Sequence, residues 1–435
     1  MQRLIFINRF FFPDHSATSQ MLSDLVFYLA STGREVHVVT GTQIYDDPKA
    51  SLPAYEIIND VHVHRISSTR FGRAALLGRS IDYLSFYRSV WHCLIQVMRR
   101  GDIVIAKTDP PLVSVVAMTA ARRKGARLIN WLQDIFPETA VELGVPFMRG
   151  PIAAGLAVLR NRSLRDAEAT AVIGDLMARK VESLGTPAER IHVIPNWSND
   201  EDIQPIALID NPLRQAWGLE GKFVLGYSGN LGRAHEFNTV LVAAERLRSD
   251  TRFVFLMIGG GKRFDELARI VKLRGLDSSF RFIPYQERKM LAYSLGVPDA
   301  HWLSLNPKLE GLIVPSKFYG IASAGKPVIV IGDKDGELAR LVQQFACGVA
   351  IEPGDAGALL SILLRLSAEP ESVAEMGKRA REMLDEHFTR QKGLDRWREL
   401  LGQLDQSQLS EGVGPSSNRS FAPIVKSGAG RPSAQ

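Results

Sequence analysis

The sequence predicts an α/β protein made of two doubly wound, Rossmann-like domains that face each other across a cleft. The chain has 435 residues, which is too long for one ordinary domain. Short runs of β-branched and apolar residues alternate with amphipathic helical segments in both halves, a pattern typical of mostly parallel sheets covered by helices. A segment rich in Asp and Pro, 199–213, separates the two halves and predicts a linker.

The first half begins with a short buried strand, because residues 4–7 are all apolar. Ser19 can cap the next helix and Gly33 ends it, and the alternation then continues to residue 198. The predicted strands are 4–7, 35–40, 61–66, 102–106, 127–131, 170–173 and 191–194. The predicted helices are 20–31, 81–99, 112–123, 151–168 and 175–184.

The second half repeats the pattern and then ends in helices. Its predicted strands are 223–227, 253–258, 281–283, 301–305, 328–331 and 349–351. Its predicted helices are 236–248, 264–274, 287–294, 336–344, 356–367, 372–386 and 390–403. We therefore expect an N-terminal domain at 1–198, a C-terminal domain at 199–388 and a last helix within 389–404. Residues 405–435 are rich in Ser, Gly, Pro and Gln, which predicts a disordered tail.

Composition narrows the class of protein. An apolar content of 45% and a charged content of 23% are those of a soluble globular protein, and no stretch reaches the roughly 18–20 uncharged apolar residues of a membrane span. Arg9 and Pro13 interrupt the apolar N-terminus, so it does not resemble a signal peptide. Cys93 and Cys347 stand far apart in apolar surroundings, which favours core packing in a reducing compartment. The His and Cys residues form no zinc pattern, so we expect no metal.

One segment of the chain is strongly basic. Residues 65–127 contain twelve Lys and Arg against three Asp, with Phe71, Leu84 and Trp91 among the apolar residues between them. Cations beside apolar side chains suit a helix that lies on an anionic membrane, which would place the protein in the cytoplasm, peripherally on the inner membrane. An ordinary solvated face over a normal core is an equally good interpretation. Nucleic acid is not expected as a partner, because no helix-turn-helix, zinc-finger or RNA-binding pattern accompanies the charge.

The most informative motif is EGLIVPSKFYGIASAGKPV at 310–328. Ser316 is a candidate N-cap of a short helix at 317–324, which Gly325 ends. A helix start that carries a serine and Lys317 can bind an anion through free N–H groups and an ammonium. Glu310 can accept hydrogen bonds from sugar or ribose hydroxyls. Together these groups suit a nucleotide diphosphate sugar, although an ordinary helix start with a solvated lysine would show the same pattern.

A second motif, GYSGNLGRAH at 226–235, follows a predicted strand and precedes a predicted helix. Its glycines let the backbone approach a phosphate, and Arg233 and His235 offer hydrogen-bond donors. A glycine-rich turn is also simply a way to connect a strand to a helix. The phosphate-binding interpretation is therefore supported mainly because this motif lies in the same predicted domain as the motif at 310–328.

The P-S-K turn and the A-G-K-P-V strand entry of the first motif resemble the nucleotide-sugar site of retaining glycosyltransferase family 4, whose members have the GT-B fold. The chain looks most similar to the bacterial enzymes that build O-antigen, exopolysaccharide and colanic-acid-type glycans. The family carries two glutamates eight positions apart around this turn. In this chain the second falls on Gly320 and the first on Leu312, two residues from Glu310.

The resemblance extends to the second motif, which in the family commonly reads G-R-L-x-x-x-K-G and clamps the diphosphate through its Arg and Lys. Aligned on Gly229, the chain has Asn230 at the arginine position and His235 at the lysine position, and Arg233 can restore the displaced charge. In GT-B transferases the turn that contains Gly260 borders the nucleotide base.

The resemblance also implies roles for loops of the first half. The loop with His15 and Ser16 occupies the place where the family has a small-residue loop that touches donor and acceptor. Asp134 stands where many members carry a cleft histidine. Its carboxylate could orient the donor sugar or accept the proton of the acceptor hydroxyl, or it could merely cap the helix that follows. Asp109, in another strand-end loop, could line the acceptor pocket.

These similarities imply a retaining glycosyltransferase that moves a sugar from a UDP-sugar to a lipid-linked glycan at the membrane, in bacterial surface polysaccharide biosynthesis. Front-face attack, with the leaving diphosphate accepting the proton, requires charge stabilisation by Lys317 and Arg233; Asp134 is the third catalytic candidate, and no cofactor is expected. Two alternatives stay open. One is a UDP-sugar 2-epimerase of the same fold, and the other is a non-catalytic protein that binds a nucleotide sugar or a membrane.

Overall fold

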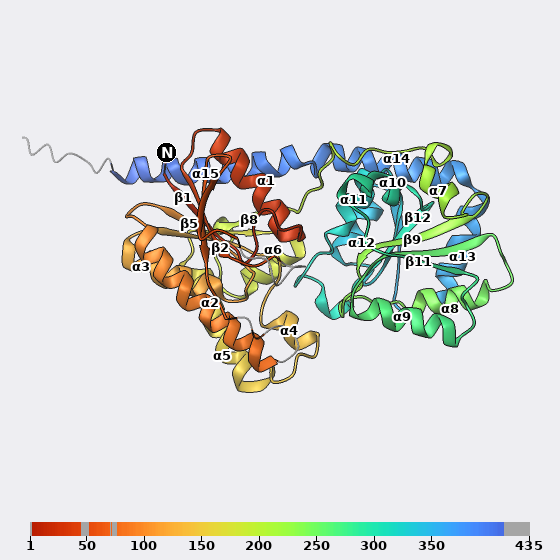
Figure 1. Cartoon of the computed structure of the whole chain (residues 1–435), viewed down its shortest axis with the longest axis horizontal. Helices are drawn as coiled ribbons and strands as arrows, with labels where there is room; N and C mark the ends of the chain where they lie inside the picture. Colours follow the sequence, from red (N-terminus) through yellow and green to blue (C-terminus); the bar gives the residue numbers. More distant parts are fainter. Residues whose placement is uncertain (1, 45–51, 70, 72–75, 413–435) are drawn as a thin grey trace, which may run out of the picture.

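The computed structural model describes residues 2–44, 52–69, 71 and 76–412. They form two α/β domains that lie side by side, connected by the linker after residue 198 and by a long helical segment at the C-terminal end (Figure 1). Each domain is a mostly parallel sheet with helices on both faces, as the sequence predicted.

The N-terminal sheet has eight strands in the order β3-β4-β2-β1-β5-β6-β7-β8. All neighbouring pairs are parallel except β3 and β4, which form an antiparallel hairpin. The edge strand β3 was not predicted. It has only four residues, YEII, and although three of them are apolar, its side chains are exposed or half-buried in the structure. The strands are β1 (Leu4–Ile7), β2 (Val36–Gly41), β3 (Tyr55–Ile58), β4 (Val61–Ile66), β5 (Ile103–Lys107), β6 (Arg127–Trp131), β7 (Ala169–Val172) and β8 (Ile191–Val193).

Alternate side chains of this sheet build two cores, one on each face. Leu4 and Phe6 of β1 pack toward α1, whereas Ile5 and Ile7 pack toward α2 and α3. The short helix α4 was not predicted. The helices of this domain are α1 (Ala17–Ser31), α2 (Leu76–Val97), α3 (Val113–Lys124), α4 (Glu138–Glu142), α5 (Gly150–Asp166) and α6 (Asp175–Ser183).

The C-terminal sheet has six parallel strands in the order β11-β10-β9-β12-β13-β14. Its strands are β9 (Phe223–Asn230), β10 (Phe253–Gly260), β11 (Phe280–Ile283), β12 (Ala300–Ser304), β13 (Val328–Ile331) and β14 (Gly348–Ile351). The chain moves outward from β9 to β11 and then returns to place β12 beside β9. In doubly wound sheets, ligands bind at the carboxyl ends of strands at such a switch point.

Helices cover both faces of the C-terminal sheet. They are α7 (Pro212–Ala216), α8 (Asn238–Arg246), α9 (Lys262–Leu273), α10 (Leu291–Gly296), α11 (Lys317–Ser323), α12 (Glu337–Gln344), α13 (Ala356–Ala368) and α14 (Pro370–His387). Among the described residues, none of the helices of either domain is both long and apolar enough to cross a membrane.

The last helix, α15 (Arg390–Gly412), lies on the N-terminal domain next to α1 (Figure 1). Trp397 is fully buried, with its ring centroid 4.7 Å from that of Trp131, and Arg34 forms an ion pair with Asp405. The helix therefore continues past residue 404, where the sequence predicted the tail to begin, because a helix already anchored by packing extends into polar residues at little cost. Residues 413–435 of the predicted tail lie outside the described part of the chain.

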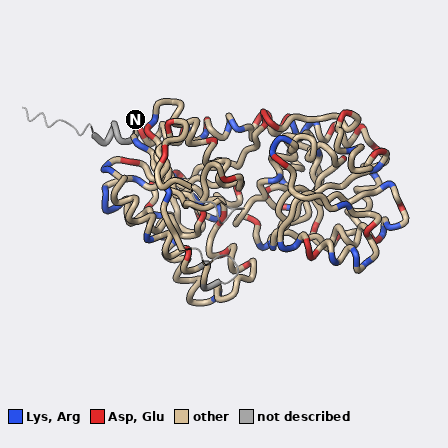
Figure 2. The backbone as a smooth tube through the Cα atoms, viewed as in Figure 1, with Lys and Arg blue, Asp and Glu red and all other residues tan. Residues whose placement is uncertain are grey.

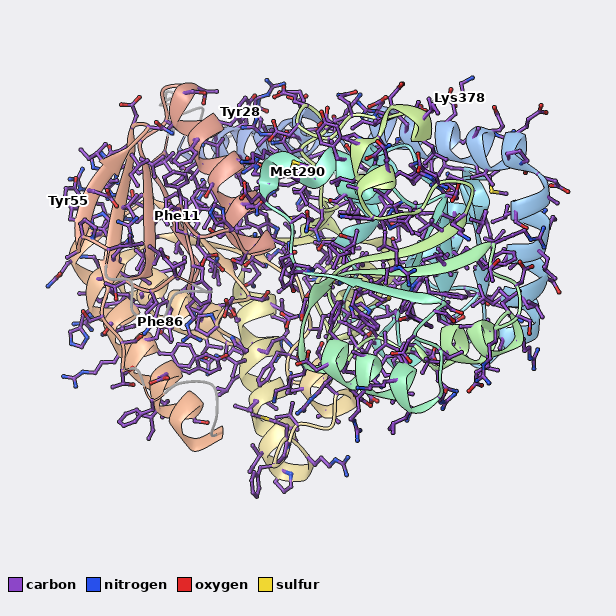
Figure 3. All side chains as sticks on the ribbon, turned by 45° about the vertical axis from the view of Figure 1, so that its right-hand side comes forward. Phe11, Tyr28, Tyr55, Phe86, Met290 and Lys378 are labelled. Atoms are coloured by element: carbon purple, nitrogen blue, oxygen red, sulfur yellow. The ribbon has the colours of Figure 1, made fainter. Side chains whose placement is uncertain are left out.

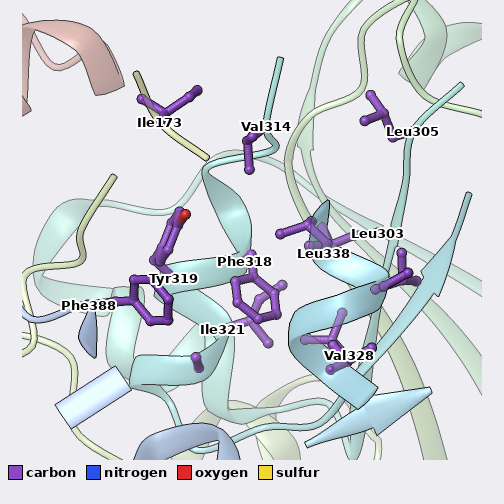
Figure 4. Packing of buried hydrophobic residues seen from close by; sticks show 14 of the residues in the cluster. Ile173, Leu303, Leu305, Val314, Phe318, Tyr319, Ile321, Val328, Leu338 and Phe388 are labelled. Carbon is purple, nitrogen blue, oxygen red and sulfur yellow. The ribbon is translucent and has the colours of Figure 1, made fainter. Parts of the chain in front are cut away.

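The two domains touch at the carboxyl ends of their strands. The Ile135 N–H donates to the Leu312 carbonyl over 3.0 Å, beside a short antiparallel bridge between Asp134 and Ile313. Behind this bridge one hydrophobic cluster spans both domains, and Ile173 enters it from the N-terminal side (Figure 4). Its labelled C-terminal members are Leu303, Leu305, Val314, Phe318, Tyr319, Ile321, Val328 and Leu338.

Candidate active site

Lys317 is the central charge of the cleft on the C-terminal side. It is the first residue of α11, and its Nζ lies 3.2 Å from Nε2 of His235 and 5.5 Å from the centroid of the Tyr227 ring. Gly229 makes this position possible, because a Cβ there would lie only 2.8 Å from Cε of Lys317. Burial lowers the pKa of Lys317 to about 8. The sequence left open an ordinary solvated lysine; in the structure Lys317 is half-buried and its ammonium contacts His235.

His235 accepts from Lys317 and is neutral. Its Nδ1 lies 2.6 Å from the carbonyl oxygen of Ser304, which can only accept a hydrogen bond, so Nδ1 carries the proton and Nε2 does not. Burial, with the charge of Lys317, lowers the pKa of His235 to about 3. His235 therefore does not replace a family lysine as a cation. It holds the ammonium of Lys317 in place instead.

Arg263, which the sequence gave no reason to select, supports the turn that contains His235. Its guanidinium donates to the His235 carbonyl and lies 4.3 Å from the centroid of the Phe237 ring. By contrast, the side chain of Arg233 is exposed on the turn, and within the described residues it has no hydrogen bond or ion pair. The guanidinium of Arg233 is thus not fixed by a partner among the described residues.

Asn230 and Gly260 lie at the carboxyl ends of β9 and β10. The backbone carbonyl of Asn230 accepts from the Tyr227 hydroxyl at 2.8 Å. The side chain of Asn230 lies over Gly261, because a Cβ on Gly261 would be only 2.1 Å from Oδ1 of Asn230. A Cβ on Gly260 would lie 3.0 Å from the ring of Tyr285, so this ring borders the glycine turn.

Glu310 is turned toward the protein. Its Oε2 accepts from the backbone N–H of Glu337 at 3.1 Å, and burial, with the nearby charges of Asp333 and Glu337, raises its pKa to about 7. Glu337, which the sequence gave no reason to select, accepts in turn from the backbone N–H groups of Asp175 and Leu176 at 3.0 and 2.9 Å. The carboxylate of Glu337 thus connects the C-terminal domain to the start of α6 in the N-terminal domain, and Glu310 holds the backbone of Glu337.

Ser316 does not cap α11. Its own backbone is helical, with φ −66° and ψ −18°, and its side chain makes no capping hydrogen bond. A capping residue normally has extended backbone angles, which turn its hydroxyl back toward the first free N–H groups. The N-cap prediction was therefore wrong.

A cavity of about 230 Å³ lies between the domains beside α11. Ser316, Lys317 and Gly320 line it from α11 and the residue before it, and Asp24 lines it from α1. A Cβ on Gly320 would meet only Leu295, at an ordinary 3.7 Å, so the position of the second family glutamate faces open space. Its remaining lining residues are Ala17, Gln20, Met21, Trp197, Ser198, Asn199, Asp202, Ile203, Ser228, Arg288, Leu291, Leu295 and Ile321.

The loop before α1 is held by a buried acid that the sequence did not single out. Asp14 accepts from both the backbone N–H and the hydroxyl of Ser16, while His15 is exposed and its carbonyl accepts from Gln20. Behind the loop, the fully buried Lys107 donates to the Thr18 carbonyl at 2.8 Å, and burial holds its pKa well below the usual range. The loop is thus fixed by Asp14 and Lys107.

Asp134 lies at the domain contact, in the backbone bridge to Ile313. Burial chiefly raises its pKa to about 6, Asp109 adds to the rise, and a hydrogen bond with Thr108 opposes it. Its Oδ1 is buried without a hydrogen-bond partner. Asp134 and Asp109 are thus close enough to interact, whereas Lys317 and His235 form a separate cluster in the other domain. Among the described residues, no group of three or more His, Cys, Asp or Glu is arranged to hold a metal ion.

The chain is similar to known proteins over most of its length. Residues 17–197 match the model of a glycosyl transferase 4-like domain, and residues 210–383 match that of glycosyl transferases group 1. The probable glycosyltransferase WbjE of Pseudomonas aeruginosa is 26% identical over 303 residues, which cover 69% of this chain and 74% of that protein. The putative colanic acid biosynthesis glycosyl transferase WcaI of Escherichia coli K12 is 26% identical over 368 residues, covering 80% and 88%.

Solved structures share the two-domain architecture. A sucrose-phosphate synthase from Thermosynechococcus elongatus superposes with a TM-score of 0.74 and 16% identity, covering 94% of this chain and all of that one. The Anabaena protein HepE, solved in complex with UDP-glucose, superposes with a TM-score of 0.68 and 16% identity, covering 93% and 100%. At these identities the likeness shows the fold.

Proposed function

Because this chain belongs to the group 1 glycosyltransferases and has their two-domain GT-B fold, we propose that it is a retaining enzyme that transfers a sugar from a UDP-sugar to a membrane-associated glycolipid. The family and fold class predicted from the sequence are confirmed, and the chain is an enzyme and not a non-catalytic binding protein. The similarity to WcaI supports a place in bacterial polysaccharide biosynthesis.

One observation carries the proposal: the half-buried side chain of Lys317, whose ammonium is held by His235 beside Gly229, at the carboxyl ends of β9 and β12. With a pKa of about 8, Lys317 is mostly protonated at pH 7, and a bound diphosphate would favour the charged form further. A fixed positive charge in a water-poor site stabilises charge that develops on a leaving group. HepE, of the same fold, was solved with UDP-glucose, which supports a UDP-sugar as donor.

The configuration at the anomeric carbon is retained if the acceptor hydroxyl attacks this carbon on the same face from which the diphosphate leaves. The bond between the anomeric carbon and the diphosphate oxygen breaks, the new bond to the acceptor oxygen forms on the same face, and the hydroxyl proton passes to a phosphate oxygen. Lys317 balances the charge on the diphosphate, with exposed Arg233 able to close over it. Asp134, with a pKa of about 6, is mostly ionised at pH 7 and can orient the sugar from the opposite domain.

Exposed apolar side chains of the N-terminal domain support the lipid acceptor. Phe71 and Leu84 are 64% and 66% exposed near and on α2, and Phe147 and Ile152 are 81% and 56% exposed near the start of α5. In the same domain, Arg88 lies on α2, and Arg122, Arg123 and Lys124 lie in the last turn of α3; Lys and Arg are coloured blue in Figure 2. Apolar side chains beside cations suit adsorption to an anionic bilayer. The side chains of Arg70, Arg73 and Arg79, which also fall in the basic segment, lie outside the described residues.

The test is release of UDP from UDP-sugars by the purified protein with isolated bacterial membranes, followed by NMR of the product. Transfer with retention of the anomeric configuration is expected, and an inverted product would refute the mechanism. Incubation with UDP-GlcNAc alone addresses the remaining alternative, because a 2-epimerase would convert this donor without any acceptor.

A further inference from the structure

A second cavity of the C-terminal domain lies at the opposite edge of the sheet from Lys317. Its volume is about 640 Å³, within the range of small-molecule sites. It is bounded by the starts of β9 and β13, by the end of α13, by α14 and by the linker at 205–208. Lys378, labelled in Figure 3, belongs to the α14 rim. The A-G-K-P-V end of the first motif borders this cavity, but the proposed transfer reaction does not use it.

The walls of the cavity are largely apolar. Phe223, Leu366 and Val373 line it from three different elements, and Pro205 and Ile206 line it from the linker. Apolar walls of this kind bind the hydrocarbon part of a ligand through the area that they remove from water.

Lys326 places one uncompensated charge among these walls. Its side chain is 8% exposed, and within the described residues its ammonium has neither a hydrogen bond nor an ion pair. Asp299 is close enough to oppose the effect of burial, yet its carboxylate is already bound by Arg214 at 3.1 Å and by the Val224 N–H at 2.7 Å. Burial of an unpaired ammonium is costly, and here it lowers the pKa of Lys326 to about 8.

The other cations of the rim already have partners. Lys222 donates to the Thr251 carbonyl at 2.8 Å, and Arg252 is paired with Asp250. Arg381 donates to two backbone carbonyls at 3.0 and 3.1 Å. Lys378 lies 3.7 Å from Glu382. Among the described residues that line the cavity, Lys326 is therefore the cation whose side chain has neither a hydrogen bond nor an ion pair.

We propose that this cavity is a second ligand site, which binds a small amphipathic anion with its anionic group on Lys326 and its apolar body against Phe223, Leu366 and Val373. The two features suit the two parts of such a ligand. A free inorganic anion would leave the apolar walls hydrated, and a neutral apolar molecule would leave the ammonium unpaired.

The probe for this site is octyl phosphate below its micelle concentration, measured with the full chain by isothermal titration calorimetry and thermal unfolding. Binding at one site that excess UDP does not displace is expected, with binding of n-octanol and of inorganic phosphate at least tenfold weaker. Failure of octyl phosphate to bind, displacement by UDP, or equal binding of inorganic phosphate would overturn the proposal.

Two variants locate the probe. Lys326→Met removes the charge but keeps an apolar stem, and the loss of a charged hydrogen bond should weaken binding at least about tenfold. Lys272→Met, at an exposed position on α9, is the matched control and should bind as the wild type does. Ala374→Trp, at an exposed position of α14 in the cavity wall, should block the site without disturbing the core. Wild-type affinity in both Lys326→Met and Ala374→Trp would place the probe elsewhere and refute the assignment.

Discussion

Replacement of Lys317 by methionine tests the proposed mechanism most directly. Methionine preserves the apolar stem that packs beside Gly229 and Tyr227, and it removes only the ammonium. Loss of one preorganised charge contact to a leaving group costs about 10²- to 10³-fold in turnover. We therefore expect turnover to fall at least about 100-fold, with weaker binding of UDP.

The same substitution should raise the free energy of unfolding although it lowers turnover. The pKa of Lys317 is about 8 in the folded protein and 10.5 for the unperturbed side chain, so the unfolded state binds more protons between these pH values. The free energy of unfolding of the wild type should therefore rise with pH across this window, and the charged form should destabilise the fold below pH 8. At 1.36 kcal/mol per pKa unit, Lys317→Met should gain up to about 3 kcal/mol at pH 7.

Activity and stability are measured on the same preparations, by UDP release and by thermal unfolding between pH 7 and 10.5. Lys272→Met, which removes an exposed lysine of the same domain, is the control and should match the wild type in both assays. Turnover of Lys317→Met within a few-fold of the wild type would remove Lys317 from the reaction. A variant that is less stable at pH 7 would refute the burial argument.

Three further predictions concern the cleft and the membrane. Within the described residues only Oε2 of Glu310 accepts a hydrogen bond, which leaves Oε1 for a hydroxyl of the donor. Glu310→Gln should therefore raise the donor Michaelis constant more than that of the acceptor in steady-state kinetics, and unchanged constants would leave Glu310 a structural acid. Because its folded pKa of about 7 lies above the ordinary 4.5, the wild type but not the variant should lose stability from pH 4.5 to 7. Asp134→Asn should lower turnover by about 10²-fold or more. It should also abolish the fall in rate below about pH 6 that protonation of Asp134 causes in the wild type, and if that fall persists in the variant, it belongs to another group. The double variant Leu84→Glu, Ile152→Glu should no longer float with anionic liposomes, whereas Leu273→Glu, at an exposed leucine of the other domain, should still do so. If the wild type itself does not bind such liposomes, the proposed membrane surface is refuted.

The sequence alone determined the features that depend on neighbouring residues. Apolar runs and helical periodicity predicted both doubly wound units and the linker between them, because the spacing of apolar residues within a strand or helix shows which of its faces is buried. The P-S-K turn and the A-G-K-P-V strand entry led to the family and to Lys317. Strand β3 was not predicted, because a run of only four residues, YEII, is too short to be distinguished from a loop by its pattern. The hydroxyl of Ser316 was wrongly assigned to a cap, because the backbone angles of a residue cannot be read from residue types.

Only the tertiary structure decided how these residues act. Lys317 and His235 are 82 positions apart, and they meet because β9 and β12 are neighbours in the sheet. Burial, which depends on every element packed around a group, makes His235 neutral and lowers the pKa values of Lys317 and Lys326. The bond from Glu337 to the other domain likewise joins residues more than 160 positions apart. Charge, exposure and partners of a side chain are properties of the packed fold, since they are set by atoms that the local sequence does not contain.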